Sequence, residues 1–318
     1  MRGAERVARV WAHMAVNFEQ GDSPGYAEIA RGVAWDAELV AAVSSLPEGK
    51  WQPNLWLGAV RYLGGPVSSF AAWRAFVMEH WERVVRVVLE RSTQTNEVGR
   101  CATLLPVLAQ LPGPLALIEV GASAGLCLYP DRYRYSFDGA PPLGAGPGPV
   151  LECVTEGGVP VPDRLPQVVW RGGIDLNPLD AGDEGDVGWL EALIWPGGQE
   201  AGRLERLRGA AGVVAADPPV MVAGDLLEGL PALVARAPEG ATVVVLHSAV
   251  LAYLGREERE EFASLVGGLG VRWVSNEGWR VFAEWEGARP AQEGLFTLAL
   301  DGRVVGHAGE HGRRLVWV

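Results

Sequence analysis

The sequence has few of the residues on which disulfide frameworks, thiolate metal sites and nucleic-acid surfaces are built. Its 318 residues contain three widely spaced cysteines, Cys101, Cys127 and Cys153. No C-x-x-C spacing occurs, so we expect neither a disulfide framework nor a thiolate-bound metal. Lys50 is the only lysine, no run of arginines occurs, and the formal net charge is −12. Because such a surface repels phosphate, we expect no nucleic-acid partner.

Long apolar segments are also missing. No stretch of about eighteen residues is uniformly apolar, and charges are scattered through residues 1–18, so we expect neither a membrane-spanning helix nor an export signal. With 48% apolar and 21% charged residues, the chain has enough apolar material for a folded core. These features predict a cytoplasmic globular protein with no membrane partner.

Residues 1–110 have a helical pattern, because their apolar positions recur at intervals of three and four. Ser23, followed by proline, and Asp36 are predicted helix starts. The longest helix is expected over about 69–91. The pattern predicts an N-terminal helical cap over residues 1–110.

After residue 110 the pattern changes to short apolar runs separated by helical segments, which predicts an α/β fold with a Rossmann-like, doubly wound and mostly parallel sheet over residues 111–318. The runs typical of strands buried on both faces are 115–120, 168–175, 219–225, 242–247 and 271–277. Asp301 and Gly302 predict an antiparallel C-terminal hairpin. Residues 139–166, rich in proline and glycine, indicate an irregular insertion with little regular structure beyond VLECV.

Residues 119–126 contain the strongest functional signal, because an apolar strand there runs into small residues that let a ligand approach the backbone. The pattern fits an E-x-G-x-x-x-G loop for a nucleotide or for S-adenosylmethionine, in which the glutamate orients the loop or accepts from the methionyl amine. It also spells the G-x-S-x-G of a nucleophile elbow, and packing alone is a third reading. The candidate cofactor contacts are Glu119, Gly121, Ala122, Ser123 and Gly125.

The context of the loop favours the cofactor over the elbow. The region before it is helical, and no HGGG-type oxyanion loop precedes Ser123. Glu119 would also place a negative charge near a developing oxyanion, which opposes hydrolysis. The elbow would need His307 or His311 as its base and Asp225 as the partner of that base.

Polar residues end the later strands. Ligands of open parallel sheets bind outside the carboxyl ends of the strands, so these residues should face the same crevice. Asp175 is a candidate for a ribose hydroxyl, while Asp225 and Leu226 are candidates for the adenine. His247 is the candidate catalytic residue, as a general base or in substrate binding, although a structural histidine is also possible there. Ser248 is a candidate for substrate binding.

A second residue competes with Asp175 for the ribose. Asp138 follows Gly121 by 17 residues (138 − 121), near the usual spacing of about 20, whereas Asp175 follows it by 54 (175 − 121). We favour Asp175 because its segment is the more strand-like and the insertion accounts for the distance.

The end of the helical region, residues 94–100, is polar for a segment that enters a helix next to the ligand loop. Glu97 and Arg100 are three residues apart and share a helix face, where they form a weak surface pair or, if buried, grip substrate. The candidate substrate contacts in this segment are Gln94, Asn96, Glu97 and Arg100.

Several segments together resemble a bacterial family catalogued as a domain of unknown function, which is distantly similar to class I S-adenosylmethionine-dependent methyltransferases. The segments are QTNEVGR (94–100), EVGASAGL (119–126), DRYRY (131–135), GIDLNPLD (173–180), WLEALIWP (189–196), HSAVLAYL (247–254) and SNEG (275–278). The resemblance implies a seven-stranded sheet with an antiparallel last hairpin, the cofactor over the first strand's loop, and a cap that builds the substrate site. It departs from the class at Ser123, where a middle glycine is common.

The leading hypothesis is therefore a methyltransferase-like enzyme that uses S-adenosylmethionine on a small molecule. The alternatives are a serine hydrolase that uses Ser123 and a non-catalytic nucleotide-binding module. No metal is expected, because His307 and His311 lack the helical H-x-x-x-H spacing and a carboxylate at ligand spacing.

Overall fold

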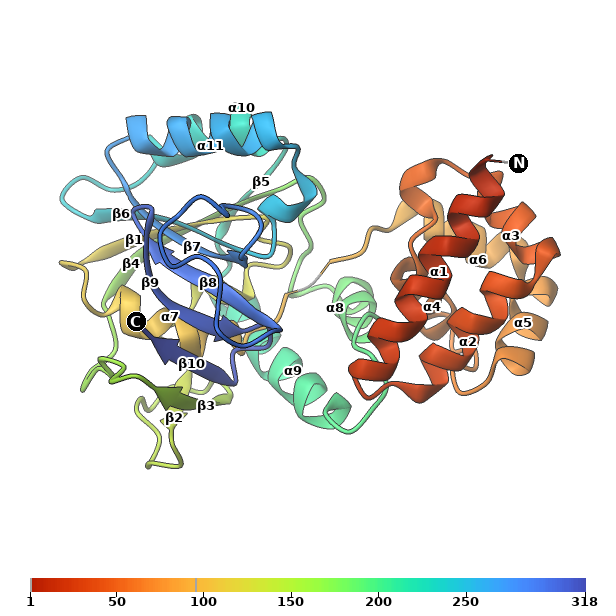
Figure 1. Ribbon diagram of the computed structural model, residues 1–318. Helices are drawn as coiled ribbons and strands as arrows, with labels where there is room; N and C mark the ends of the chain where they lie inside the picture. The colour runs from red at the N-terminus through yellow and green to blue at the C-terminus, as the bar shows by residue number, and fades with distance from the viewer. Residues whose placement is uncertain (1, 95) are drawn as a thin grey trace. The chain divides into compact units, whose positions relative to one another are not determined.

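The computed structural model describes residues 2–94 and 96–318 and divides the chain into two compact units (Figure 1). The helical unit consists of residues 1–95 and 184–204, and the sheet unit of residues 96–183 and 205–318. The sequence pattern placed this division at residue 110 and assigned 184–204 to the sheet. That the two parts act as cap and catalytic domain stays a prediction.

The helical unit confirms one predicted helix start and corrects one predicted helix. Asp36 caps its helix by accepting from the backbone N–H of Leu39, whereas Ser23 makes no side-chain cap bond. The single long helix expected over 69–91 is wrong, because His80 leaves helical geometry and packs its ring against Phe76. The elements are α1 (Arg2–Gln20), α2 (Pro24–Trp35), α3 (Ala37–Ser44), η1 (Glu48–Lys50), α4 (Pro53–Tyr62), α5 (Phe70–Glu79), α6 (Trp81–Glu90), α8 (Glu184–Ala192) and the start of α9 (Glu200–Ala216).

Large aromatic side chains form the core of the helical unit. Trp11 and Trp73 are fully buried, with ring centroids 5.9 Å apart. Trp189 of α8 is also fully buried and donates from its indole N–H to the carbonyl of Ser92 at 3.0 Å. Each buried indole removes a large apolar surface from water. This burial explains why α8, far along the chain, belongs to the helical unit.

The sheet unit confirms the predicted α/β fold, with a mostly parallel sheet and an antiparallel C-terminal hairpin. It has ten strands rather than the seven that the resemblance implied, in the order β2-β3-β10-β9-β8-β7-β6-β1-β4-β5. The strands are β1 (Leu115–Val120), β2 (Arg134–Phe137), β3 (Val150–Glu156), β4 (Val168–Asp175), β5 (Val220–Ala223), β6 (Thr242–Ser248), β7 (Arg272–Gly278), β8 (Leu295–Leu300), β9 (Arg303–Gly309) and β10 (Arg314–Trp317).

The additional strands extend the sheet on the side of the hairpin. Asp301 and Gly302 have the positive φ angles, 52° and 78°, of a tight turn between β8 and β9, as expected. Strand β10 pairs antiparallel with β9 and parallel with β3, which pairs with β2. The insertion contains β3, which covers the expected VLECV segment.

Helices α10 (Leu226–Val234) and α11 (Arg256–Gly268) lie along one face of the sheet (Figure 1). Their apolar side chains pack on Ile118, Val245 and Trp273 in one buried cluster. The short helix η2 (Leu126–Leu128) packs on β1 and β4, and α7 (Arg100–Leu108) packs on β3. Strand β1 lies between β4 and β6, so the chain continues in opposite directions on either side of it. This is a topological switch point, where open α/β sheets bind ligands.

One further finding concerns membranes. Within residues 2–94 and 96–318, no helix has the length and apolar character that crossing a bilayer requires.

We predict that Ile118→Ala lowers the free energy of unfolding by about 2–5 kcal/mol, because it opens a cavity in the cluster under α10 and α11. The matched control is Val169→Ala, since Val169 lies in the neighbouring strand β4 with 45% of its surface exposed, and it should change the value by less than about 1 kcal/mol. Urea denaturation measures both. Equal losses for the two variants would contradict this assignment of the core.

Candidate functional site

The loop after β1 has left-handed backbone geometry at three positions. The φ angles are 68° at Gly121, 51° at Ser123 and 72° at Gly125. Only glycine adopts this region without strain, so Ser123 is held there by its surroundings. A β-carbon at Gly121 would collide with the side chain of Val250. The loop therefore brings its backbone close to the carboxyl ends of β1 and β6.

The carboxylate of Asp175, at the end of β4, holds this loop. Its Oδ2 accepts from the backbone N–H of Ser123 at 2.8 Å, and its Oδ1 accepts from the N–H of Asn177 at 2.8 Å. The carbonyl of Ser123 accepts from the N–H of Leu179 at 3.0 Å. Charge-assisted bonds of this kind are about twice as strong as neutral ones. The end of β4 thus compensates for the strained φ angle of Ser123.

Asp138, the other candidate for the ribose, lies elsewhere in the sheet. It follows β2, which forms the sheet edge beyond β3, whereas β1 is separated from β2 by six strands in the order given above. Both of its oxygens accept from Thr155, one from the N–H at 2.7 Å and one from the hydroxyl at 2.5 Å. The structure brings Asp175 to the ligand loop and leaves Asp138 at the far edge.

The helical segment directly after the loop is only one turn long. Only η2, three residues long, follows Gly125, and the chain then enters β2. A helix dipole builds up over several turns, so this turn contributes little attraction for anions. The polar groups that remain for a ligand are those of the loop backbone and of the strand ends.

Asp225 begins α10 as its N-cap. Its Oδ1 accepts from the N–H groups of Leu227 at 2.8 Å and Glu228 at 3.4 Å, and the residue is exposed. Leu226, the next residue, is half buried against the apolar cluster under α10. Gly224 before it has a φ of 154°, which turns the chain out of β5.

His247 is fully buried, with both ring nitrogens engaged. Its Nδ1 lies 2.7 Å from Oε1 of Glu277, and its Nε2 accepts from the indole N–H of Trp273 at 2.9 Å. Because Nε2 accepts, Nδ1 bears the proton and donates to Glu277. The same Oε1 also accepts from the N–H groups of Val250 and Leu251. This arrangement is that of a structural histidine, and it lends no support to the expected role in proton transfer.

Ser248, one residue further along β6, lies at the sheet's carboxyl edge. Its hydroxyl accepts from the side-chain amide of Asn276 at 2.8 Å, and the two residues are register partners in β6 and β7. Ser248 is 8% exposed and Asn276 is fully buried. The pair ties β6 to β7 beside the loop.

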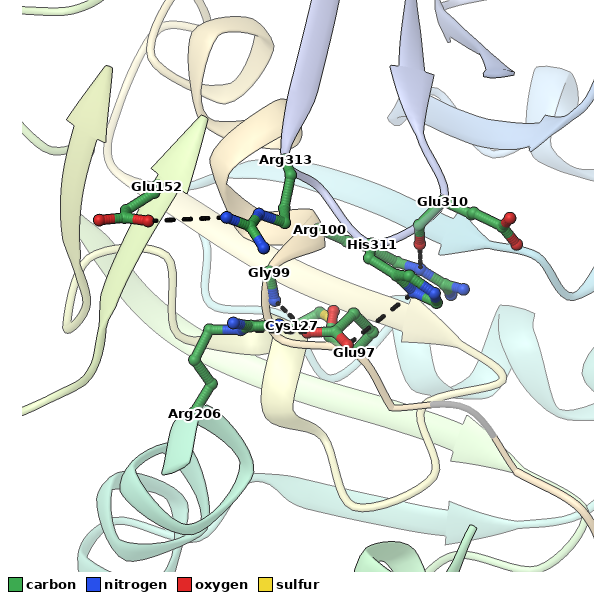
Figure 2. A network of polar contacts seen from close by, with 9 residues as sticks. All are labelled: Glu97, Gly99, Arg100, Cys127, Glu152, Arg206, Glu310, His311 and Arg313. Carbon is green, nitrogen blue, oxygen red and sulfur yellow. Dashed lines mark hydrogen bonds and ion pairs between the residues drawn. The ribbon is translucent and has the colours of Figure 1, made fainter. Parts of the chain in front are cut away.

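Glu97 and Arg100 are both buried, which excludes the surface pair, one of the two alternatives for them. Figure 2 shows the polar contacts around them. Glu97 binds Arg206 of α9 instead, with 3.3 Å between Oε1 and Nη2, and also accepts from the N–H of Gly99 at 3.1 Å. Its Oε2 lies 3.9 Å from Nδ1 of His311. Sequence reasoning missed Arg206, because an arginine in a charged helix is usually a surface residue.

Arg100 binds two backbone carbonyls. Its Nε donates to Glu310 and its Nη1 to Ser248, both at 2.9 Å, and the guanidinium lies 5.8 Å from the ring centre of Phe296. Arg100 therefore joins three segments of the sheet unit, namely the start of α7, the end of β6 and the turn after β9.

Asn96 contacts the ligand loop directly, because its side-chain amide donates to the carbonyl of Ala122 at 2.7 Å. Its neighbour Thr95, in the same motif, lies outside the described residues. Gln94 belongs to the helical unit, so its contact with substrate stays a prediction.

Glu119 is a buried carboxyl group in the second-last residue of β1, next to the loop. Burial raises the pKa of Glu119 well above its usual value, and the neighbouring Cys127 raises it further, while the charge of Arg100 opposes the shift. Only 5% of the residue is exposed. Burial therefore disfavours the charged form of the Glu119 carboxyl group.

The residues that the hydrolase alternative requires have other partners. His311 lies beside Glu97, and Asp225 caps α10. His307 sits in β9, where burial lowers its pKa. The structure therefore shows no Ser123–His–Asp225 hydrogen-bonded triad among the described residues. In the same part of the chain, no group of three or more His, Cys, Asp or Glu side chains is arranged to hold a metal ion.

The chain belongs to the bacterial family described as "Uncharacterized protein conserved in bacteria (DUF2332)", which matches residues 8–317. No curated protein matches the sequence. The family description names no activity, so the function rests on the residues of the site.

We predict that Glu119→Gln makes stability less dependent on pH. When folding raises the pKa of an acid, the folded protein loses stability as the pH rises above the pKa of that acid in the unfolded chain, here about 4.5. The reason is that the unfolded chain releases the proton first. Glutamine does not titrate, so the free energy of unfolding of the variant relative to the wild type should increase from pH 4 to pH 8. Denaturant midpoints at several pH values measure this. A constant difference over that range would show that folding does not raise the pKa of Glu119.

Proposed function

We propose that the sheet unit binds S-adenosylmethionine at the carboxyl edge of the sheet and transfers its methyl group to a small molecule. The observation that supports this most is the left-handed loop of Gly121, Ser123 and Gly125 at the topological switch point. Its backbone is fastened to Asp175, and Asp225 begins the helix after the next strand. Dinucleotides and related ligands bind α/β sheets at such points.

The residues at this edge are chemically suited to an adenosyl group. Each oxygen of Asp175 accepts one N–H, and a carboxylate has about four acceptor sites, so capacity remains for ribose hydroxyls. Asp225 uses Oδ1 for capping, and its other oxygen can accept from the adenine amine. Pro219 and Met221 lie beside Gly125, where they offer apolar surface to a flat base.

The sulfonium of S-adenosylmethionine supplies an electrophilic methyl group when it is bound. The contribution of this chain is to hold donor and acceptor in line, which accounts for a large part of such rate enhancements. The loop backbone, Asp175 and Asp225 orient the donor, and Ser248 faces the acceptor. His247 keeps its structural bonds, so the acceptor's proton leaves to water rather than to this ring.

One observation favours a second candidate, the serine hydrolase. Ser123 follows a strand and has a φ of 51°, and a strained serine at a strand end is typical of a nucleophile elbow. However, its N–H is bonded to Asp175, and the histidines that would serve as its base have other surroundings. A non-catalytic binding module differs from the methyltransferase only by the absence of turnover.

Asp225→Ser tests the adenine contact without removing the helix cap, because serine is also a good N-cap. We expect the affinity for S-adenosylhomocysteine to fall by about twofold to a hundredfold, the range for one lost hydrogen bond to a neutral or charged partner. Isothermal titration measures it. Asp36→Ser, at the N-cap of α3, is the matched control and should leave the affinity unchanged. Unaltered affinity in Asp225→Ser would remove this residue from the site.

Ser123→Ala separates the methyltransferase from the hydrolase. We expect the variant to keep its affinity for S-adenosylhomocysteine within about threefold, because the Ser123 contact with Asp175 uses the backbone N–H. A fluorophosphonate probe should not label the wild-type protein. Labelling that disappears in the alanine variant, detected by intact mass, would support the hydrolase instead.

A further inference from the structure

Arg100 is a buried cation without a carboxylate partner. It is 4% exposed, and its hydrogen-bond acceptors are the backbone carbonyls of Glu310 and Ser248. Within residues 2–94 and 96–318, no carboxylate forms an ion pair with it. Buried charges in proteins are usually paired, because removing them from water is costly.

The carboxyl groups around Arg100 do not balance its charge. Glu97 is bound to Arg206 and approached by His311 (Figure 2). Glu119 is close enough for the charge of Arg100 to act on its pKa, and burial raises that pKa well above its usual value. Neither carboxyl group forms an ion pair with Arg100 among the described residues.

Arg100 also lies where a ligand would bind. Its Nη1 contacts the last residue of β6, Ser248, at the same edge as the ligand loop. Two buried oxygens in this surrounding, Oε2 of Glu119 and Oδ1 of Asn276, have no hydrogen-bond partner among the described residues. Buried polar atoms in native proteins are rarely left without partners, so these orphaned oxygens indicate that a ligand group with N–H or O–H donors lies beside Arg100.

The geometry points to Arg100 as the anchor of an anion subsite that binds a carboxylate of the ligand. A guanidinium has five N–H donors, of which the two carbonyls take two. The remaining donors suit the two oxygens of a carboxylate. The carboxylate comes from the amino-acid part of the adenosyl cofactor or from the methyl acceptor. Only the first source rests on the proposed function.

The test compares ligands with and without a carboxylate in the wild type, Arg100→Gln and Arg100→Lys. Isothermal titration uses S-adenosylhomocysteine, which has the amino-acid group, and 5′-methylthioadenosine, which lacks it. If the cofactor supplies the carboxylate, Arg100→Gln weakens S-adenosylhomocysteine about tenfold or more and leaves methylthioadenosine within about twofold. Arg100→Lys recovers part of the loss. Arg272→Gln, which breaks an ion pair with Asp301, is the control and changes neither affinity.

If the acceptor supplies the carboxylate, the variants bind both adenosyl ligands as the wild type does. Thermal-shift measurements then compare the melting temperature with acetate, benzoate or 3-phenylpropionate to that with the corresponding amide. At least one acid should stabilise the wild type more than its amide does, and Arg100→Gln should lose this difference. Equal behaviour of acids and amides in the wild type, with unchanged adenosyl affinities in the variants, overturns the proposal.

Two further comparisons keep the result interpretable. If Arg100→Gln does not melt cooperatively, the wild type alone decides. It should bind S-adenosylhomocysteine about tenfold or more tightly than the carboxamide of that ligand, or else be stabilised by acids more than by their amides. The absence of both preferences overturns the proposal. If no adenosyl ligand binds the wild type, the proposed function fails, and the acid and amide series still decides the role of Arg100.

Discussion

The hydrogen bond from the backbone of Ser123 to Asp175 is the interaction on which the candidate site depends. Ser123 is not a glycine, yet its φ is 51°, a conformation that costs about 1–3 kcal/mol when nothing compensates for it. The carboxylate at the end of β4 offsets that cost and joins the loop to the neighbouring strand. Asn96 also binds this loop, through the carbonyl of Ala122. The backbone is thus fixed in place before any ligand arrives, which is the arrangement that precise binding requires.

Buried charges organise the surroundings of this loop. Glu97, Arg206 and His311 are far apart in the sequence and meet in one network (Figure 2). Arg100 joins the start of α7 to the end of β6. Removing one member of such a network leaves a partner buried and unpaired, which costs more than the interaction itself contributes. The network therefore joins α9 and the turn after β9 to the segment that leads into α7.

Much of the central sheet could be predicted because its strands are continuous apolar runs. Strand β1 matches the expected range residue for residue, and β6 differs by one residue at its end. The pairing of β10 with β3 could not be predicted, because the local sequence of a short strand does not indicate which distant strand it will pair with. The break at His80 was missed because the apolar residues continue through it, and α8 was misassigned because periodicity does not show which core a helix joins.

The same distinction applies to the site. The loop and Asp175 could be found from the sequence, since glycines after a strand and an acid at the end of the next apolar run are local signals. The partners of His247 could not be found from the sequence, because Glu277 and Trp273 lie on β7, which follows β6 only after helix α11. Their contacts engage both ring nitrogens of His247, and its role as a base stays a prediction. Arg206 likewise became visible only when the fold brought α9 to Glu97.

The central claim is that an adenosyl ligand binds at the carboxyl edge of β1, β4 and β5, and hydrogen exchange with mass spectrometry tests it most directly. With saturating S-adenosylhomocysteine, the account predicts slower exchange of the backbone N–H groups in residues 119–126, 173–179 and 223–228. The remaining strands of the sheet should change little. Unchanged exchange in these three segments, at a ligand concentration that occupies the protein, would contradict the claim.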